Sequence, residues 1–402
     1  MGFTLIHVYN KTHSKLSTIV VAFNAGSRME GFKGFNPGIA HMLEHCIFKG
    51  TNKRDFLEIQ REIAFLGGFV NAFTSHEIVA YHITVPFENL EESIEILSDI
   101  VFCSTIPEEE FLKEKEVVKE EEISRLDDPM SYIWKEFSSR FFSNYISEPV
   151  IGTQDTIEEF TRDEVESFYK TYCKRENAIV SLSSNMSKKD AKALLIKYFG
   201  RQNGRIKRSF NHSQSEYRDS STVEIFRPGI EHTYVWIGTP GLTTGSRHDP
   251  AARILLTILG SGMDSRLFTE AREKRGLAYS ISASMSDWEY GGVTLIDSSV
   301  REANLDELLE VIDVEVNKVK SEPVTEEELQ RAKNKLRASS YHLIEDGYGT
   351  AIRGMREKLH KIFSLDEYME LLEKVTAEDV MNVANMLFDS NKKMTLICRA
   401  EV

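Results

Sequence analysis

Residues 36–50 read Asn-Pro-Gly-Ile-Ala-His-Met-Leu-Glu-His-Cys-Ile-Phe-Lys-Gly. This stretch predicts a helix, with Asn36 as its N-cap, Pro37 in its first turn and Gly50 just past its end. The residues between these bounds leave almost no polar face, so the helix is expected to be buried in a globular core. Three ionisable residues nevertheless fall inside it and need a chemical explanation: His41, Glu44 and His45.

The pair His41 and His45 is spaced for metal binding. Residues four apart lie on one face of a helix, so both imidazoles can reach one ion, and imidazole nitrogen is a preferred zinc ligand. Glu44 points its carboxylate into the same space, where it can take a proton from a water molecule held by the metal. The order His-x-x-Glu-His is that of the inverted zincins. Chance could place these residues on a solvated helix, but burying three ionisable groups costs several kcal/mol unless they are paired or bind a metal.

A catalytic zinc ion needs a third protein ligand, and the glutamate-rich stretch 108–127 offers candidates. Its apolar stripe is predicted to contain Phe111, Val117, Val118 and Leu126. Glu114 and Glu121 fall on this stripe, because positions 111, 114, 118 and 121 step by three and four. We therefore expect Glu121 to be the third ligand and Glu114 to orient a ligand histidine. The other glutamates are expected to be solvated: Glu108, Glu109, Glu110, Glu120 and Glu122.

Outside this helix the chain alternates between strand and helix patterns. β-branched and apolar runs predict strands at residues 17–23, 69–73, 79–85 and 178–182. Helical patterns cover roughly residues 88–103, 108–127 and 130–145, and Thr161 is expected to cap a further helix. A polar and basic stretch predicts a linker over 206–221.

The second half of the chain repeats the first at low similarity. Residues 161–165 match 376–380 at an offset of 215, and residues 108–111 match 326–329 at an offset of 218. Repeated helix caps could produce part of this match, but two similar offsets in the same order favour an internal duplication. In the second copy, the positions aligned with the ligand set carry none of it: Ile254, Thr257 and Ile258.

The predicted fold class is α+β, with two homologous α/β-sandwich-like halves, each an antiparallel-rich sheet covered by helices. The expected organisation is a zinc-binding catalytic half over 1–205, the linker over 206–221 and a metal-free half over 222–402. Each half is large enough to own a hydrophobic core.

Composition excludes several functional classes. The 402 residues are 41% hydrophobic and 28% charged, which is typical of a soluble globular chain. The net charge of −14 argues against nucleic acid as a partner. No run is apolar enough to span a membrane and no signal-peptide pattern opens the chain, so we expect no membrane insertion and a cytoplasmic location. Four well-separated cysteines predict buried thiols in a reducing compartment.

Three segments around the histidines resemble the pitrilysin/insulinase family of zinc peptidases, in the compact branch that includes mitochondrial processing peptidase. They are Gly26-Ser27-Arg28-Met29-Glu30, Gly38-Ile39-Ala40-His41-Met42-Leu43-Glu44-His45 and Phe48-Lys49-Gly50-Thr51. The resemblance implies one Zn²⁺ per chain on His41, His45 and Glu121, with Glu44 as the catalytic base. The family's spacing of a supporting glutamate selects Glu114.

The resemblance extends to substrate binding. Asn71, Ala72 and Phe73 look like the family's edge strand, to which a peptide substrate adds as an extra strand. Arg272 and Tyr279 look like the pair that holds the substrate and stabilises the oxyanion. Taken alone, Asn71 reads as a turn residue, Arg272 as a surface charge and Tyr279 as a strand aromatic, so these roles rest on the resemblance.

The implied function is a zinc-dependent endopeptidase that hydrolyses short or unfolded peptides. Two such halves make half of the family's closed chamber, which implies a homodimer or a heterodimer with a divergent homologous chain. Arg272 and Tyr279 would then serve the zinc of the other chain. Two alternatives stay open: a non-catalytic core or scaffold subunit, which tends to lose the metal ligands that this chain retains, and a maturation peptidase dedicated to one peptide, which would carry the same residues.

Overall fold

The computed structural model describes residues 6–201, 217–388 and 391–401, and the chain forms two compact units. The first unit consists of Met1–Tyr132, Glu148–Asn211 and His342–Leu359. The second consists of Ile133–Ser147, His212–Tyr341 and His360–Val402. Most of the linker predicted over 206–221 lies outside the described residues.

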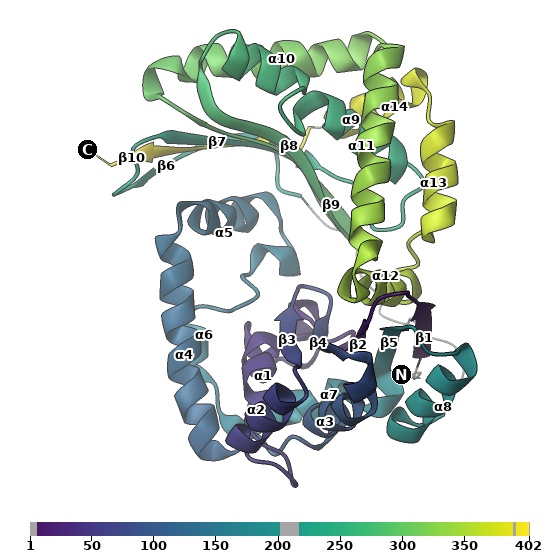
Figure 1. The fold of residues 1–402 in the computed structure, drawn as a ribbon. Coiled ribbons are helices and arrows are strands. Elements are labelled where there is room, and N and C mark those ends of the chain that lie inside the picture. Colours follow the sequence, from purple (N-terminus) through teal and green to yellow (C-terminus); the bar gives the residue numbers. More distant parts are fainter. Residues whose placement is uncertain (1–5, 202–216, 389–390, 402) are drawn as a thin grey trace. The chain divides into compact units, whose positions relative to one another are not determined.

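A five-stranded sheet forms the centre of the first unit (Figure 1). Its strand order is β1-β5-β2-β4-β3, in which β1 and β5 pair in parallel and the other neighbours pair antiparallel. The predicted strands are all present, and β3 ends the sheet beside β4. The bounds are β1 (Ile6–Lys11), β2 (Leu16–Phe23), β3 (Phe69–Thr74), β4 (Val79–Pro86) and β5 (Ala178–Ser184).

Most helices of the first unit cover one face of this sheet. Because side chains alternate along a strand, Ile19, Val21 and Phe23 of β2 all point into the core beneath these helices. The helices predicted over 88–103 and 108–127 are present, and Thr161 forms a reciprocal capping box with Glu164. The bounds are α1 (Ile39–Ile47), α2 (Phe56–Phe65), α3 (Leu90–Cys103), α4 (Glu108–Asp127), α6 (Gln154–Glu159), α7 (Arg162–Tyr172) and α8 (Lys188–Phe199).

The opposite face of the same sheet is covered by α12 (Gly347–Leu359), which comes from the second half of the sequence. Val20 and Ala22 of β2 share a small core there with Met355. The helix approaches β1 closely, since a Cβ atom added to Gly354 would lie 2.2 Å from Asn10 Nδ2. Glycine at position 354 therefore lets the helix backbone reach the sheet.

The second unit repeats this sheet with the same topology. Its strand order β6-β10-β7-β9-β8 matches that of the first sheet position by position, and its β6–β10 pair is again parallel. This agreement confirms the predicted fold of two α/β halves. The bounds are β6 (Ser221–Arg227), β7 (Thr233–Pro240), β8 (Ala278–Trp288), β9 (Gly291–Val300) and β10 (Met394–Ala400).

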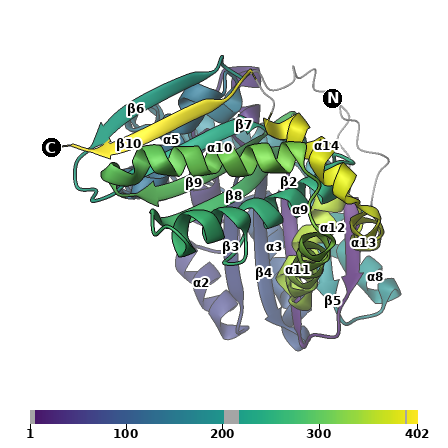
Figure 2. The ribbon, with the colours of Figure 1, turned by 90° about the horizontal axis from the view of Figure 1, so that it is seen from above.

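Five helices pack on one face of the second sheet, and Figure 2 shows α10 running across it. They are α9 (Asp249–Gly260), α10 (Leu305–Ser321), α11 (Glu326–Glu345), α13 (Leu365–Lys374) and α14 (Ala377–Phe388). α5 (Pro129–Phe141), from the first half of the sequence, packs against the sheet through Phe137, whose ring centroid lies 5.9 Å from that of Trp236 in β7. The helix predicted over 130–145 is this α5, and it ends earlier, at Phe141.

Short helical turns join these elements. One of them, η6 (Phe268–Glu273), is a π-helical turn. The others are 3₁₀ turns: η1 (Ser27–Met29), η2 (Gly31–Lys33), η3 (Phe87–Asn89), η4 (Tyr145–Ser147), η5 (Arg175–Asn177) and η7 (Glu302–Asn304).

The cysteines and the absence of an apolar spanning segment were both expected from composition. All four cysteines are free thiols; Cys46, Cys173 and Cys398 are buried, and Cys103 is half-buried. Across the described ranges, no helix combines the length and the apolar character needed to cross a membrane.

Candidate metal centre

Helix α1 carries both histidines and Glu44, and a carboxylate from outside the helix holds its N-terminus. The predicted N-cap Asn36 is wrong, because the N-cap is Gly38, whose φ of 98° suits glycine. Buried Glu30 accepts backbone hydrogen bonds from Gly38 N (3.1 Å) and Ala40 N (3.0 Å). This side chain satisfies two free N–H groups at the start of the helix; burial raises the pKa of Glu30 to about 8, and the two backbone hydrogen bonds act in the opposite direction.

His41 and His45 converge with Glu121, which comes from α4. The Nε2 atom of His41 lies 3.8 Å from Glu121 Oε1, and the Nε2 atom of His45 lies 3.3 Å from Glu121 Oε2. One potential ligand atom from each of the three residues lies within 4.8 Å of the other two. Two imidazole nitrogens and one carboxylate oxygen are the donor set of a catalytic zinc site, which keeps a fourth position for water or substrate.

This arrangement is confined to the first unit. Within the residues that the structure describes, no second group of three His, Cys, Asp or Glu side chains meets the same geometry. The aligned positions of the second unit, Ile254, Thr257 and Ile258, lie instead in the buried α9.

Glu114 contacts His45 from the side away from Glu121. Its Oε2 atom lies 3.1 Å from His45 Nδ1, and its Oε1 atom lies 2.6 Å from Lys49 Nζ. The two ring nitrogens of His45 are therefore directed at two different carboxylates, Nδ1 at Glu114 and Nε2 at Glu121. Histidines that bind metals commonly donate their second N–H to a carboxylate in this way.

Glu44 lies between the histidines and the edge strand β3. Thr74, the last residue of β3, donates its hydroxyl hydrogen to Glu44 Oε2 at 2.5 Å. Burial raises the pKa of Glu44, although the Thr74 hydrogen bond and the charge of His45 act in the opposite direction. A carboxylate with a raised pKa is suited to accept a proton near neutral pH.

The two histidines are held in opposite protonation states. Burial, followed by repulsion from His45, lowers the pKa of His41 to about 4, so that imidazole is neutral at pH 7. Burial also acts to lower the pKa of His45, but its hydrogen bonds to Glu114 and Glu121 outweigh burial and raise the pKa to about 9. In the metal-free protein, protonated His45 thus offsets the negative charge of Glu114 and Glu121. A bound cation would take over this role, and His45 would then bind it as a neutral imidazole.

Two positions on α4 differ from the prediction. Val117, assigned to the apolar stripe, is 48% exposed. Glu122, expected in solvent, is only 4% exposed, because its Oε2 atom accepts a hydrogen bond from Gln154 Nε2 at 2.7 Å. Its partner lies 32 positions away, so helix periodicity could not reveal this burial. Glu108, Glu109 and Glu120 are exposed as expected.

The predicted substrate-binding residues lie together on β3, at the edge of the sheet. Asn71 is exposed, whereas Ala72 and Phe73 are half-buried. The backbone N–H of Ala72 donates a hydrogen bond to Asn71 Oδ1 at 2.8 Å. This N–H is therefore bonded to a side chain and not to the backbone of a neighbouring strand. A strand with such an open edge is a template for pairing with another chain.

Arg272 and Tyr279 lie in the second unit and contact each other. Arg272 is exposed on η6, and its guanidinium carbon lies 5.6 Å from the ring centroid of Tyr279 and 4.9 Å from that of Phe268. Tyr279 is 73% exposed in β8. The structure therefore brings these two predicted residues together on the surface of their unit, and π-helical turns are frequent at functional sites.

Sequence reasoning did not select three polar residues that the structure places around α1. Glu30 caps the helix, Thr74 bonds Glu44, and Lys49 bonds Glu114. Each contacts a residue on another element, so residue spacing along one helix or strand gave no sign of the contact. Glu30 and Lys49 do lie in two of the segments that carry the family resemblance, although no role was assigned to them.

Two family profiles match the chain. The profile described as "Insulinase (Peptidase family M16)" matches residues 6–154, which include His41, Glu44, His45, Glu114 and Glu121. The profile described as "Peptidase M16 inactive domain" matches residues 159–336, which include Arg272 and Tyr279.

Full-length relatives show the same similarity. An uncharacterized zinc protease of Rickettsia bellii is 30% identical over 98% of this chain and 95% of its own length. The uncharacterized zinc protease YmxG of Bacillus subtilis is 30% identical over 90% of this chain and 88% of its own.

Two solved structures have a closely similar fold. The structure of a protease from Helicobacter pylori has a TM-score of 0.89 at 23% identity and covers 98% of both chains. A structure described as a peptidase M16 inactive domain from Pseudomonas fluorescens has a TM-score of 0.87 at 18% identity, over 98% of this chain and 95% of its own.

Proposed function

The chain belongs to peptidase family M16, the insulinase family, and on this premise we propose that it is a zinc-dependent endopeptidase acting on short or unfolded peptides. The observation that carries the proposal is the convergence of His41, His45 and Glu121 from two helices, next to Glu44. The zinc protease names of the full-length relatives support the same activity.

Three side chains would hold one zinc ion per chain: His41 and His45 through Nε2, and Glu121 through a carboxylate oxygen. Zinc bound there supplies a Lewis acid that polarises the scissile carbonyl and acidifies a water molecule. Glu114 fixes the ring of His45 through Nδ1, which keeps Nε2 directed at the ligand position.

Glu44 is the proposed general base. The Thr74 hydroxyl holds its Oε2 atom, and we assign Oε1 to accept the proton of the attacking water. Glu44 takes the proton from that water as it attacks and passes the proton to the leaving amine. Its raised pKa suits both transfers near neutral pH.

The open edge of β3 is the proposed substrate site, at Asn71, Ala72 and Phe73. Strand addition uses main-chain hydrogen bonds, which give affinity with little sequence preference. Because Thr74 at the end of β3 bonds Glu44, a peptide added along β3 runs past the base. We assign Arg272 and Tyr279 to substrate holding and oxyanion stabilisation, within a homodimer or a heterodimer with a homologous chain.

The test is cleavage of an unstructured peptide mixture by the purified, zinc-loaded chain, followed by mass spectrometry with and without a chelator. Cleavage that the chelator abolishes and added zinc restores is the expected result. The description of one solved relative as an inactive domain supplies the alternative, a non-catalytic scaffold. Zinc bound at one per chain without any cleavage, in the presence of a homologous partner chain, would favour that alternative. Cleavage of one peptide alone would indicate a dedicated maturation peptidase.

A further inference from the structure

A chain of charged contacts leads outward from His45 through Glu114 to Lys49. We propose that Lys49 is a positioning residue of the metal centre: it fixes the Glu114 carboxylate, which in turn holds His45 in the ring orientation that binds zinc. This inference rests on the proposed function, and it adds a residue to which neither the family's ligand spacing nor the motif assigns a role.

The geometry of Glu114 supports this role. Its two carboxylate oxygens have two different partners, Lys49 Nζ at 2.6 Å on Oε1 and His45 Nδ1 at 3.1 Å on Oε2. With both oxygens engaged, the carboxylate cannot rotate without breaking one contact. The side chains of Lys49 and Glu114 are 14% and 10% exposed, so the pair is screened less than a surface ion pair. Removing the lysine would leave a largely buried carboxylate with one partner fewer.

Lys49 is itself held in place. Its ammonium nitrogen lies 4.3 Å from the ring centroid of Phe56, a cation–π contact. Its backbone N–H donates to Cys46 O in the last turn of α1, at 3.1 Å. The next carbonyl, that of Gly50, accepts a hydrogen bond from Thr105 N at 3.0 Å, just before α4. The backbone around Lys49 is thus tied to the last turn of α1 and to the connection between α3 and α4.

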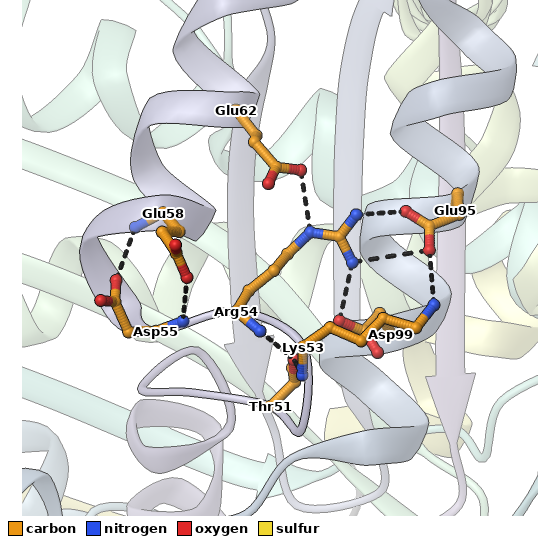
Figure 3. Close-up of polar contacts among 8 residues, drawn as sticks. All are labelled: Thr51, Lys53, Arg54, Asp55, Glu58, Glu62, Glu95 and Asp99. Carbon is orange, nitrogen blue, oxygen red and sulfur yellow. Dashed lines mark hydrogen bonds and ion pairs between the residues drawn. The ribbon is translucent and has the colours of Figure 1, made fainter.

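The loop after Lys49 is anchored on two further helices, as Figure 3 shows. Arg54 pairs with Glu62 of α2 (2.8 Å) and with Glu95 (2.5 Å) and Asp99 (2.8 Å) of α3. The hydroxyl of Thr51 donates to the same Asp99 at 2.7 Å. This network fixes the loop from which Lys49 emerges, so the lysine is presented to Glu114 from a rigid base.

The surroundings allow clean substitutions. Lys49 and Glu114 line an open hollow of about 850 Å³, which leaves room for a larger head group. Methionine at position 49 would keep an aliphatic stem against Phe56 while removing the charge. Exposed Lys113 lines the same hollow but pairs with half-buried Glu110, at 2.5 Å, rather than with Glu114, so Lys113→Met is a matched control.

The experiment measures zinc affinity by competition with a chelating dye, together with thermal melting. Lys49→Met is expected to weaken zinc binding by about tenfold or more, the effect of losing an outer partner of a metal ligand. Lys49→Arg, which keeps the charge, is expected to retain most of the affinity, and Lys113→Met all of it. If Lys49→Met does not fold, Lys49→Gln carries the same comparison.

A double-mutant cycle separates positioning from a general effect on stability. If Lys49 acts through Glu114, the variant Lys49→Met/Glu114→Gln binds zinc no more weakly than Glu114→Gln alone. Unchanged zinc affinity in Lys49→Met, or losses that add fully in the double variant, would overturn the inference while leaving the proposed function standing. A wild-type chain that binds no zinc would overturn the proposed function as well.

Discussion

The ionisable side chains on the buried helix α1 are stabilised by partners from other elements. Glu121 and Glu114 engage the two ring nitrogens of His45, and Thr74 bonds Glu44. His41 differs, because its buried Nδ1 has no hydrogen-bond partner among the described residues and its Nε2 lies 3.8 Å from Glu121, beyond hydrogen-bond range. A cation bound by Nε2 would give that nitrogen the close partner it lacks here, whereas Nδ1 would stay without one among the described residues.

Two substitutions on α1 separate metal binding from proton transfer. Glu44→Gln keeps every candidate ligand and the Thr74 contact but cannot accept a proton, so it should bind zinc normally. Its turnover should fall by about 10²–10⁴-fold, the usual contribution of a general base. His45→Ala should lose both zinc and turnover. Metal content by mass spectrometry and peptide cleavage by chromatography give both readings, and a fully active Glu44→Gln enzyme would refute the mechanism.

Zinc binding should release a proton from His45 at neutral pH. The pKa of His45 is raised to about 9 in the metal-free protein, so this imidazole is protonated at pH 7 and must lose its proton to bind. Zinc affinity should therefore rise with pH, by about tenfold per pH unit between pH 6 and 8 for this one proton. The affinity should level off once the pH passes the pKa of His45 in the folded, metal-free protein. Calorimetry in buffers of different ionisation enthalpy measures the release.

A matched control for this proton is Glu114→Gln. It removes one of the three carboxylates that raise the pKa of His45, namely Glu114, Glu121 and Glu44, so less proton release is expected at pH 7. Equal release in both proteins would show that the proton comes from another group.

At the scale of elements, the sequence predicted what depends on local pattern. The strand over 69–73 and the capping of α7 by Thr161 are present as predicted. A helix also forms within 36–50, but it is shorter than its predicted caps implied, since it runs from Ile39 to Ile47 and Phe48 closes it. The N-cap Asn36 and the solvated Glu122 were wrong because Glu30 and Gln154 reach these positions from other elements. The spacing of residues within one helix or strand does not show which residues of other elements will contact it.

The edge strand β3 makes a prediction about substrates. A peptide that adds to β3 pairs through the N–H groups of alternate residues, while the intervening N–H groups point away. Single N-methylation along a cleaved peptide should therefore block cleavage at every second position near the scissile bond and leave the others nearly unchanged. Measured kcat/KM values for such a series test this pattern. Equal tolerance at all positions would show that the substrate does not bind as a strand.

At the scale of the whole molecule, the sequence predicted the duplication but not the exchange of helices. The repeated motifs at 161–165 and 376–380 lie at corresponding places, at the starts of α7 and α14. Matching of motifs does not reveal that α5 and α12 each pack on the sheet of the other half, because motifs report the residues of a helix and not the sheet against which it packs. Each sheet receives a helix from the opposite half of the sequence, α12 on the first and α5 on the second. The metal-binding unit therefore depends on residues 342–359 for a complete core.

This dependence can be measured at Met355. Its side chain is fully buried in α12 against Val20 and Ala22 of β2, so Met355→Ala leaves a cavity under the sheet of the first unit. The expected loss in free energy of unfolding is about 2–5 kcal/mol, the range for removing a large buried side chain. Met386→Ala is the control, because Met386 is 50% exposed on α14 and its loss should cost no more than about 0.5 kcal/mol. Urea unfolding of both variants, monitored by circular dichroism and by zinc retention, measures the two free energies of unfolding. Equal stability of the two variants would show that α12 is not part of the core on which the metal-binding unit depends.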